Sequence, residues 1–71
     1  MSNIEVVLNP ERQLVLYQLL KLEGLVASGG EAKLVIENRY VEVNGEVETR
    51  KRYKLKVGDV IAFNGVTINV A

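Results

Sequence analysis

The spacing of hydrophobic residues changes about halfway along this chain. In segments 10–23 and 31–38 apolar residues recur every three or four positions, which predicts two amphipathic helices. In segments 40–48 and 59–70 apolar and polar residues alternate, which predicts β-strands, and a shorter alternation over Ile4–Leu8 predicts one more. The chain is therefore expected to place its helices before most of its strands.

Local signals indicate where these helices begin and where the first one ends. We expect Asn9 to cap the first helix and Pro10 to occupy its first position, where a missing N–H has no partner in any case. Gly24 is expected to end that helix because glycine readily adopts a left-handed conformation. Ser28 and Glu31 form a capping-box pattern, in which each side chain accepts a hydrogen bond from the backbone N–H of the other.

The second helix has no glycine at its end, and two Asn-Gly pairs follow it. Because asparagine tolerates a left-handed conformation better than arginine does, we expect this helix to end at Asn38 and not at Arg39. Asn44-Gly45 and Asn64-Gly65 each separate two alternating runs. This is the strongest short signal for a two-residue hairpin turn, since both turn residues then have positive φ. Two β-hairpins are therefore predicted.

These elements predict an α+β fold in which two adjacent helices pack on one face of a small, mainly antiparallel sheet. With 71 residues the chain has room for a single domain, residues 1–71. It contains no cysteine, so its core must form by apolar packing alone, and a hydrophobic share of 48% makes this feasible. The residues expected in that core are Leu16, Leu19, Leu20, Leu22, Ala32, Val35, Ile36, Val41, Val43 and Val47.

The charges of the chain are balanced overall but unevenly distributed. Residues 1–49 carry four basic and eight acidic side chains, a net charge of −4, whereas residues 50–71 carry five basic and one acidic, a net charge of +4. Five of the seven residues from Arg50 to Lys56 are basic. This distribution predicts a confined positive patch on an otherwise acidic domain.

Several residue types that commonly carry catalysis are missing. The chain has neither histidine nor cysteine, which removes the commonest general base, a strong nucleophile and the usual zinc ligands. It has no glycine-rich phosphate-binding motif with its lysine, and Asp59, next to Gly58, is expected to form a turn. We therefore predict a protein that is not an enzyme and that uses neither a cofactor nor a metal.

The basic segment allows two interpretations. A run of charges is commonly a solvated loop that offsets an acidic surface. Two features favour binding of a polyanion: the segment lies between two predicted strands, which hold both of its ends, and Tyr53 within it offers a face on which a base or a guanidinium could stack. Half-buried packing of Tyr53 against the sheet is the alternative.

Four motifs follow one another over residues 14–63. They are Leu16-x-x-Leu19-Leu20-Lys21-x-x-Gly24-Leu25, Ser28-x-x-Glu31-Ala32-Lys33-x-x-Ile36, Val41-x-Val43-Asn44-Gly45 and Lys54-x-x-x-Gly58-Asp59-Val60-Ile61. In this order and spacing they resemble the RNA-binding domain named after ribosomal protein S4, and the chain is most similar to the short, free-standing bacterial members. The resemblance implies the αL motif, in which two helices and the loop after the first hairpin face RNA.

The resemblance also implies residue roles. Lys21 and Lys33 match basic helix positions of the family, Ser28 matches the serine that opens the second helix, and Arg50–Lys54 match the loop that approaches RNA. The open amides at the start of the second helix offer a further anion site. The residues predicted to bind RNA are Lys21, Ser28, Gly29, Gly30, Lys33, Arg39, Arg50, Lys51, Arg52, Tyr53 and Lys54.

The chain departs from the family pattern at three places. Many members have Arg-Leu-Asp at the start of the first helix, where this chain has Val15-Leu16-Tyr17. Many have an arginine after the serine, where this chain has Gly29, and Arg39 replaces a glycine before the first hairpin. The helices have thus lost charge, for which we expect the basic loop to compensate.

We therefore predict a small non-catalytic protein that binds structured RNA, ribosomal or transfer RNA, through phosphates and shape, as a cytoplasmic monomer. The alternative is a protein-interaction module in which Glu42, Glu46 and Glu48 dock a basic partner such as a ribosomal protein. No apolar run approaches the ~18 residues of a membrane span. The N-terminus lacks the pattern of a secretory signal, so no membrane partner is expected.

Overall fold

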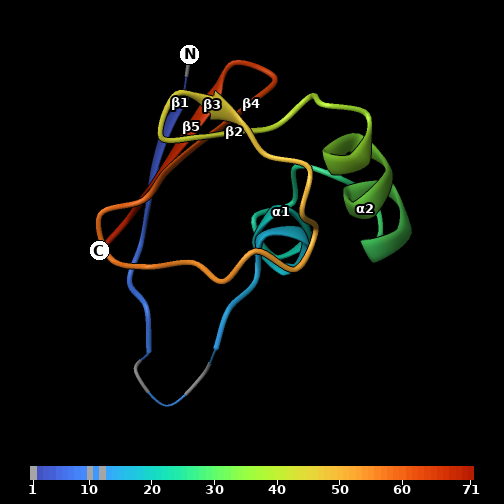
Figure 1. Cartoon of the computed structure of the whole chain (residues 1–71). Coiled ribbons are helices and arrows are strands. Elements are labelled where there is room, and N and C mark those ends of the chain that lie inside the picture. Colours follow the sequence, from blue (N-terminus) through green and yellow to red (C-terminus); the bar gives the residue numbers. More distant parts are fainter. Residues whose placement is uncertain (1, 10, 12) are drawn as a thin grey trace.

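Figure 1 shows the computed structural model of the chain, which describes residues 2–9, 11 and 13–71. Within these residues five strands and two helices follow one another as β1 (Ser2–Val6), α1 (Leu16–Leu22), α2 (Gly29–Glu37), β2 (Glu42–Val43), β3 (Glu46–Val47), β4 (Val60–Phe63) and β5 (Val66–Val70). Both helices lie on the same side of the sheet (Figure 1). The predicted α+β arrangement is confirmed.

The strands form one sheet in the order β1-β5-β4-β2-β3. β1 runs parallel to β5, with Ile4 opposite Ile68, and the other three pairings are antiparallel. A parallel pair needs a long crossover between its strands, and here that crossover contains both helices and the first hairpin. The prediction of a mainly antiparallel sheet is confirmed.

Both predicted hairpin turns are present, between β2 and β3 and between β4 and β5. The two residues of the first turn, Asn44 and Gly45, have φ values of 54° and 85°. The corresponding values for Asn64 and Gly65 are 50° and 80°. Positive φ at both central residues matches the twist of the flanking strands. The turn sequences therefore determine where the sheet folds back.

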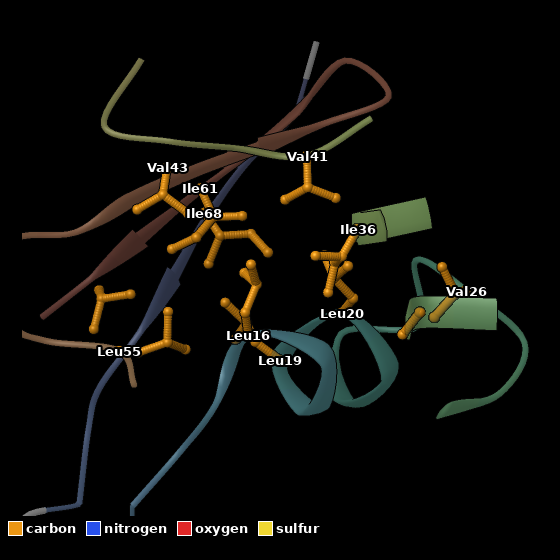
Figure 2. Close-up of a cluster of buried hydrophobic side chains, with 12 residues drawn as sticks. Leu16, Leu19, Leu20, Val26, Ile36, Val41, Val43, Leu55, Ile61 and Ile68 are labelled. Atoms are coloured by element: carbon orange, nitrogen blue, oxygen red, sulfur yellow. The ribbon is translucent and has the colours of Figure 1, made fainter. Parts of the chain in front are cut away.

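The core lies between the helices and the sheet, as Figure 2 shows, with side chains of β2, β4 and β5 pointing toward α1. Its buried members are Leu16, Leu19, Leu20, Val26, Ala32, Ile36, Val41, Val43, Leu55, Ile61, Ile68 and Val70. The predictions for Leu22 and Val47 are wrong, since these side chains are 66% and 44% exposed. Leu22 lies outside the arc of α1 that Leu16, Leu19 and Leu20 share, and Val47 pairs with the outward-facing Glu42. Val35 is only half-buried.

The first helix begins at Leu16 and not near Asn9, so this prediction is wrong. Val15 is extended, with φ −109° and ψ 163°, and it pairs with Lys54 in an antiparallel bridge. The side chain of Asn9 accepts a hydrogen bond from the backbone N–H of Glu11 at 2.9 Å and therefore forms a local turn. The expected place of Pro10 lies outside the described residues. Because Val15 is paired with a distant segment, the helix begins only at the next residue, Leu16.

The ends of α1 and α2 follow the predicted signals with two differences. α1 ends at Leu22, and Gly24 follows its C-cap residue Glu23 with φ 71°. Ser28 Oγ accepts from the N–H of Glu31 at 3.1 Å, but the Glu31 carboxylate accepts from Ala27 at 3.2 Å, one residue before the amide that a capping box uses. Asn38 ends α2 with φ −87°, and Arg39 is the left-handed residue, with φ 70°. The helix thus stops where expected, although the strained conformation falls on Arg39.

Candidate nucleic-acid interface

The basic loop, residues 50–56, is fixed against the start of α1, and its path past that helix is visible in Figure 1. The backbone N–H of Leu16 donates to the carbonyl of Tyr53 at 2.9 Å, and that of Tyr17 donates to Lys51 at 3.1 Å. The N–H of Leu55 donates to Leu14 at 3.0 Å. The first amides of a helix have no partner within the helix. The loop supplies these partners, so its backbone is held while most of its basic side chains are exposed.

Asp59 holds the other side of the loop. Its buried carboxylate, 4% exposed, accepts hydrogen bonds from the Tyr53 hydroxyl at 2.9 Å, the Lys56 N–H at 2.9 Å and the Asn44 side chain at 3.0 Å. Asn44 in turn accepts from the N–H of Val60 at 2.9 Å. Asp59 therefore links the first hairpin, the basic loop and β4. The predicted turn is found at Gly58, but the sequence did not indicate these distant partners.

The same network sets the ionisation of two side chains. Burial would raise the pKa of Asp59, but the donors from Asn44, Lys56 and Tyr53 together outweigh burial and lower it. Burial, followed by the hydrogen bond to Asp59, raises the pKa of Tyr53. An ionised carboxylate therefore accepts from a protonated phenol at neutral pH. Tyr53 is half-buried, as the alternative interpretation of this residue expected.

Two cations of the loop are paired with carboxylates. Arg50 binds Glu48 through two hydrogen bonds of 2.9 Å, and this contact with Arg50 is the main cause of the lowered pKa of Glu48. The Arg50 guanidinium also lies 5.2 Å from the centre of the Tyr53 ring. Lys51 Nζ lies 2.8 Å from the Glu37 carboxylate and so links the loop to the last turn of α2. The positive charges of both residues are thus locally compensated.

Two other cations meet at an aromatic ring. Lys33 Nζ, from α2, lies 4.7 Å from the centre of the Tyr17 ring, and the Arg52 guanidinium, from the loop, lies 5.9 Å from the same ring. Tyr17 belongs to α1 and is half-buried against the core. Two basic residues far apart in sequence therefore converge. Tyr17 was not among the residues predicted to bind RNA, although the departure of Val15-Leu16-Tyr17 from the family motif was a signal.

The remaining predicted residues lie at different distances from Tyr17 along the two helices and the loop. Lys21 is exposed one turn after Tyr17 on α1, and Gly29 precedes Lys33 by one turn on α2. Ser28 and Arg39 lie beyond opposite ends of α2, roughly 15 Å apart along its axis. Gly30 lies in the first turn of α2 and Lys54 is exposed beside Val15. The predicted residues thus extend along the whole of α2 and the loop.

Other parts of the surface offer less chemistry. Two largely apolar grooves, of about 460 and 520 Å³, border the segment from Val7 to Leu14. Across residues 2–9, 11 and 13–71 no three acidic, histidine or cysteine side chains gather as a metal site would require. In the same part of the chain, neither helix has the length and hydropathy needed to cross a membrane.

Sequence comparison connects this chain to characterised families. The family model described as "S4 domain" matches residues 9–71. The "Putative RNA-binding protein YbcJ" of Escherichia coli (strain K12) is 47% identical over 55 residues, which cover 78% of this chain and 79% of that protein. The "Probable ribosome maturation protein RlbA" of Bacillus subtilis (strain 168) is 42% identical over 52 residues, 73% of each chain.

Solved structures agree with these matches. The solution structure of YbcJ from Escherichia coli, described as having an αL motif involved in RNA binding, superposes with a TM-score of 0.64 at 39% identity, covering 100% of this chain and 87% of that one. The 30S ribosomal protein S4e from Thermoplasma acidophilum has a TM-score of 0.57 at 28% identity, covering 78% of this chain and 28% of that one. The S4 resemblance and the αL fold are confirmed, and the chain belongs to the S4 domain family.

Proposed function

We propose that this protein binds structured RNA, ribosomal or transfer RNA, and performs no chemistry on it. The observation that carries the proposal is the convergence of Lys33 and Arg52, from a helix and a loop, at the Tyr17 ring. The names of the relatives point to the same class of partner, since one is described as RNA-binding and another as a ribosome maturation protein. The proposal places the protein in the cytoplasm, where it would act as a monomer.

The mode of binding follows from the shape of RNA helices. The deep, narrow major groove of A-form RNA hides the base edges, so a domain of this size mainly contacts phosphates and 2′-hydroxyls. Arginines of the basic loop can bind phosphate through two donors, whereas Lys21, Lys33 and Lys54 act as point charges. The amides of Gly29 and Gly30 at the start of α2 add donors for a further phosphate. The fixed loop backbone reduces the entropy lost on binding.

The structure gives less support to docking of a basic protein on the acidic residues of the first hairpin. Glu48 would belong to that surface, but its carboxylate already binds Arg50 through both oxygens. Glu42 and Glu46 remain exposed. RNA binding is therefore the function that we propose.

Fluorescence polarisation with a labelled ribosomal RNA stem–loop tests the proposal. Four to six phosphate contacts predict that log K falls with log salt concentration with a slope on the order of −3 to −5. The variant Arg50→Glu/Arg52→Glu is expected to abolish measurable binding, whereas the reversal Lys56→Glu, in the same loop but outside the predicted site, should weaken it much less. A wild-type protein that binds no RNA would contradict the function, and equal binding by the double variant would contradict the location.

A further inference from the structure

The contacts of four basic residues, Lys33, Arg50, Lys51 and Arg52, are of two kinds. Arg50 and Lys51 each bind a carboxylate, of Glu48 and Glu37. Among the residues that the structure describes, Lys33 and Arg52 form no ion pair and instead lie within 6 Å of one aromatic ring. The distinction matters because a carboxylate removes the positive field of its partner, whereas a tyrosine ring carries no net charge.

An aromatic ring can therefore hold cations without neutralising them. The face of the ring attracts a cation through its quadrupole, and this attraction still leaves the cation able to bind an anion. Tyr17 is well placed for this role. Its side chain packs against the core, and its backbone N–H donates to the carbonyl of Lys51 in the loop. Lys33 and Arg52 are thus positioned before any ligand arrives. Lys33 Nζ and the Arg52 guanidinium carbon lie 4.7 and 5.9 Å from the ring centre, and their separation cannot exceed the sum of these two distances.

We propose that Tyr17 is a positioning residue that assembles Lys33 and Arg52 into one phosphate-binding site, which is the main contact with the RNA backbone. In this arrangement Arg50 and Lys51 chiefly shape the loop and contribute less to affinity. The inference rests on the proposed function, because it assigns the strongest phosphate contact within the same RNA-binding face. Tyr17→Asp would place one negative charge beside the two cations and offset one of their two positive charges.

Three substitutions of Tyr17 test the role of the ring, with the ribosomal RNA stem–loop as the probe. Tyr17→Phe keeps the ring and should bind within about twofold of the wild type. Tyr17→Leu keeps apolar volume but loses the cation contacts and should weaken binding about three- to tenfold. Tyr17→Asp removes the ring and offsets one of the two positive charges, and it should weaken binding more than Tyr17→Leu does. Thermal unfolding of each variant shows whether the domain is still folded at the assay temperature.

Variants that remove either a single cation or a whole ion pair test the division of the cations independently of Tyr17. Lys33→Met and Arg52→Gln should each weaken binding about tenfold and reduce the magnitude of the salt slope by about 1. Two matched controls, Glu48→Gln/Arg50→Gln and Glu37→Gln/Lys51→Met, remove an ion pair without changing net charge, and each should weaken binding only two- to threefold.

The outcomes separate the inference from the function on which it rests. If wild-type RNA binding is found but the paired controls lose as much affinity as Lys33→Met and Arg52→Gln, the division of the cations is wrong. If Tyr17→Leu binds like Tyr17→Phe, the ring does not assemble the site. A wild-type protein without measurable affinity for the stem–loop would contradict the proposed function, and the inference with it.

Discussion

Two connections of this domain, residues 7–9, 11 and 13–15 between β1 and α1 and residues 48–59 between β3 and β4, lie outside its helices and strands and meet where Val15 pairs with Lys54. The second is fixed by Asp59 and by two amides of α1, and it buries Leu55. In the first, Leu8 donates to the Ala71 carbonyl at 2.9 Å, but two grooves border the segment and Val7 is 75% exposed. A connection without regular structure can therefore be held in place by a buried carboxylate.

This difference bears on function. A cation on a mobile segment must lose conformational freedom before it can contact phosphate, whereas a cation on a fixed segment has already lost it. The charges of the basic loop lie on the fixed connection, next to α1 and α2. The buried carboxylate of Asp59 thus supports an exposed positive surface although it takes no part in that surface.

Removal of the Asp59 charge should have the largest effect on stability. Asp59→Asn keeps one oxygen that can accept from the Tyr53 hydroxyl and the Lys56 N–H, but it replaces the other oxygen with a donor that faces the Asn44 amide N–H, and it removes the negative charge. We expect the free energy of unfolding to fall by about 2 kcal/mol, as measured by urea denaturation. RNA affinity should fall too, because the first hairpin loses its link to the loop and the bonds that remain have no ionised acceptor. The matched variant Glu46→Gln, which alters an exposed carboxylate, should change stability by less than about 0.5 kcal/mol.

Acid should reproduce part of this loss. Because the folded protein lowers the pKa of Asp59, the carboxylate stabilises the fold above its unfolded pKa, and this contribution is lost as pH falls from about 5 through the folded pKa. Urea midpoints between pH 7 and pH 3 should therefore decrease more in the wild type than in Asp59→Asn. Glu48→Gln is the comparison, since the pKa of Glu48 is also lowered. Parallel pH profiles for the wild type and Asp59→Asn would show that Asp59 is not the group responsible.

The sequence predicted the features of this fold that depend on neighbouring residues. The Asn44-Gly45 turn, the Ser28 cap and the end of α1 at Gly24 each involve only a few consecutive positions. The predicted start of α1 was wrong because Val15 pairs with Lys54, a partner that no local signal identifies. Turn chemistry and capping are therefore readable from one segment, whereas strand-like pairing of two connections is not.

The candidate site shows the same limit. Charge distribution was sufficient to select the basic loop and, with the family motif, Lys33. It did not show that glutamates compensate Arg50 and Lys51, nor that Tyr17 joins the two segments, because these contacts arise only when α1, α2 and the loop pack together. The residues that position the cations were harder to find than the cations themselves.

The short connection between α2 and β2 is an intermediate case, because it is fixed at both ends and strained at Arg39. Arg39→Gly should stabilise the fold by about 1 kcal/mol relative to Arg39→Ala, since only glycine adopts φ 70° without strain. Both variants lose the same charge, so both should weaken RNA binding equally. Urea denaturation and polarisation measure the two effects separately. Equal stabilities would show that the strain at this position is negligible.

The smallest effect on stability is expected for the exposed valines of the two connections. Val7→Ser and Val57→Ser alter valines that are 75% and 72% exposed, one in each connection, and each should change the free energy of unfolding by less than about 0.5 kcal/mol. Equal small effects would show that the connections differ in their hydrogen-bonded anchors and not in their exposed apolar residues. A loss above about 1 kcal/mol in Val7→Ser alone would mean that Val7 is covered in solution. The first connection would then be held more firmly than its contacts indicate, and the contrast with the basic loop would be weaker.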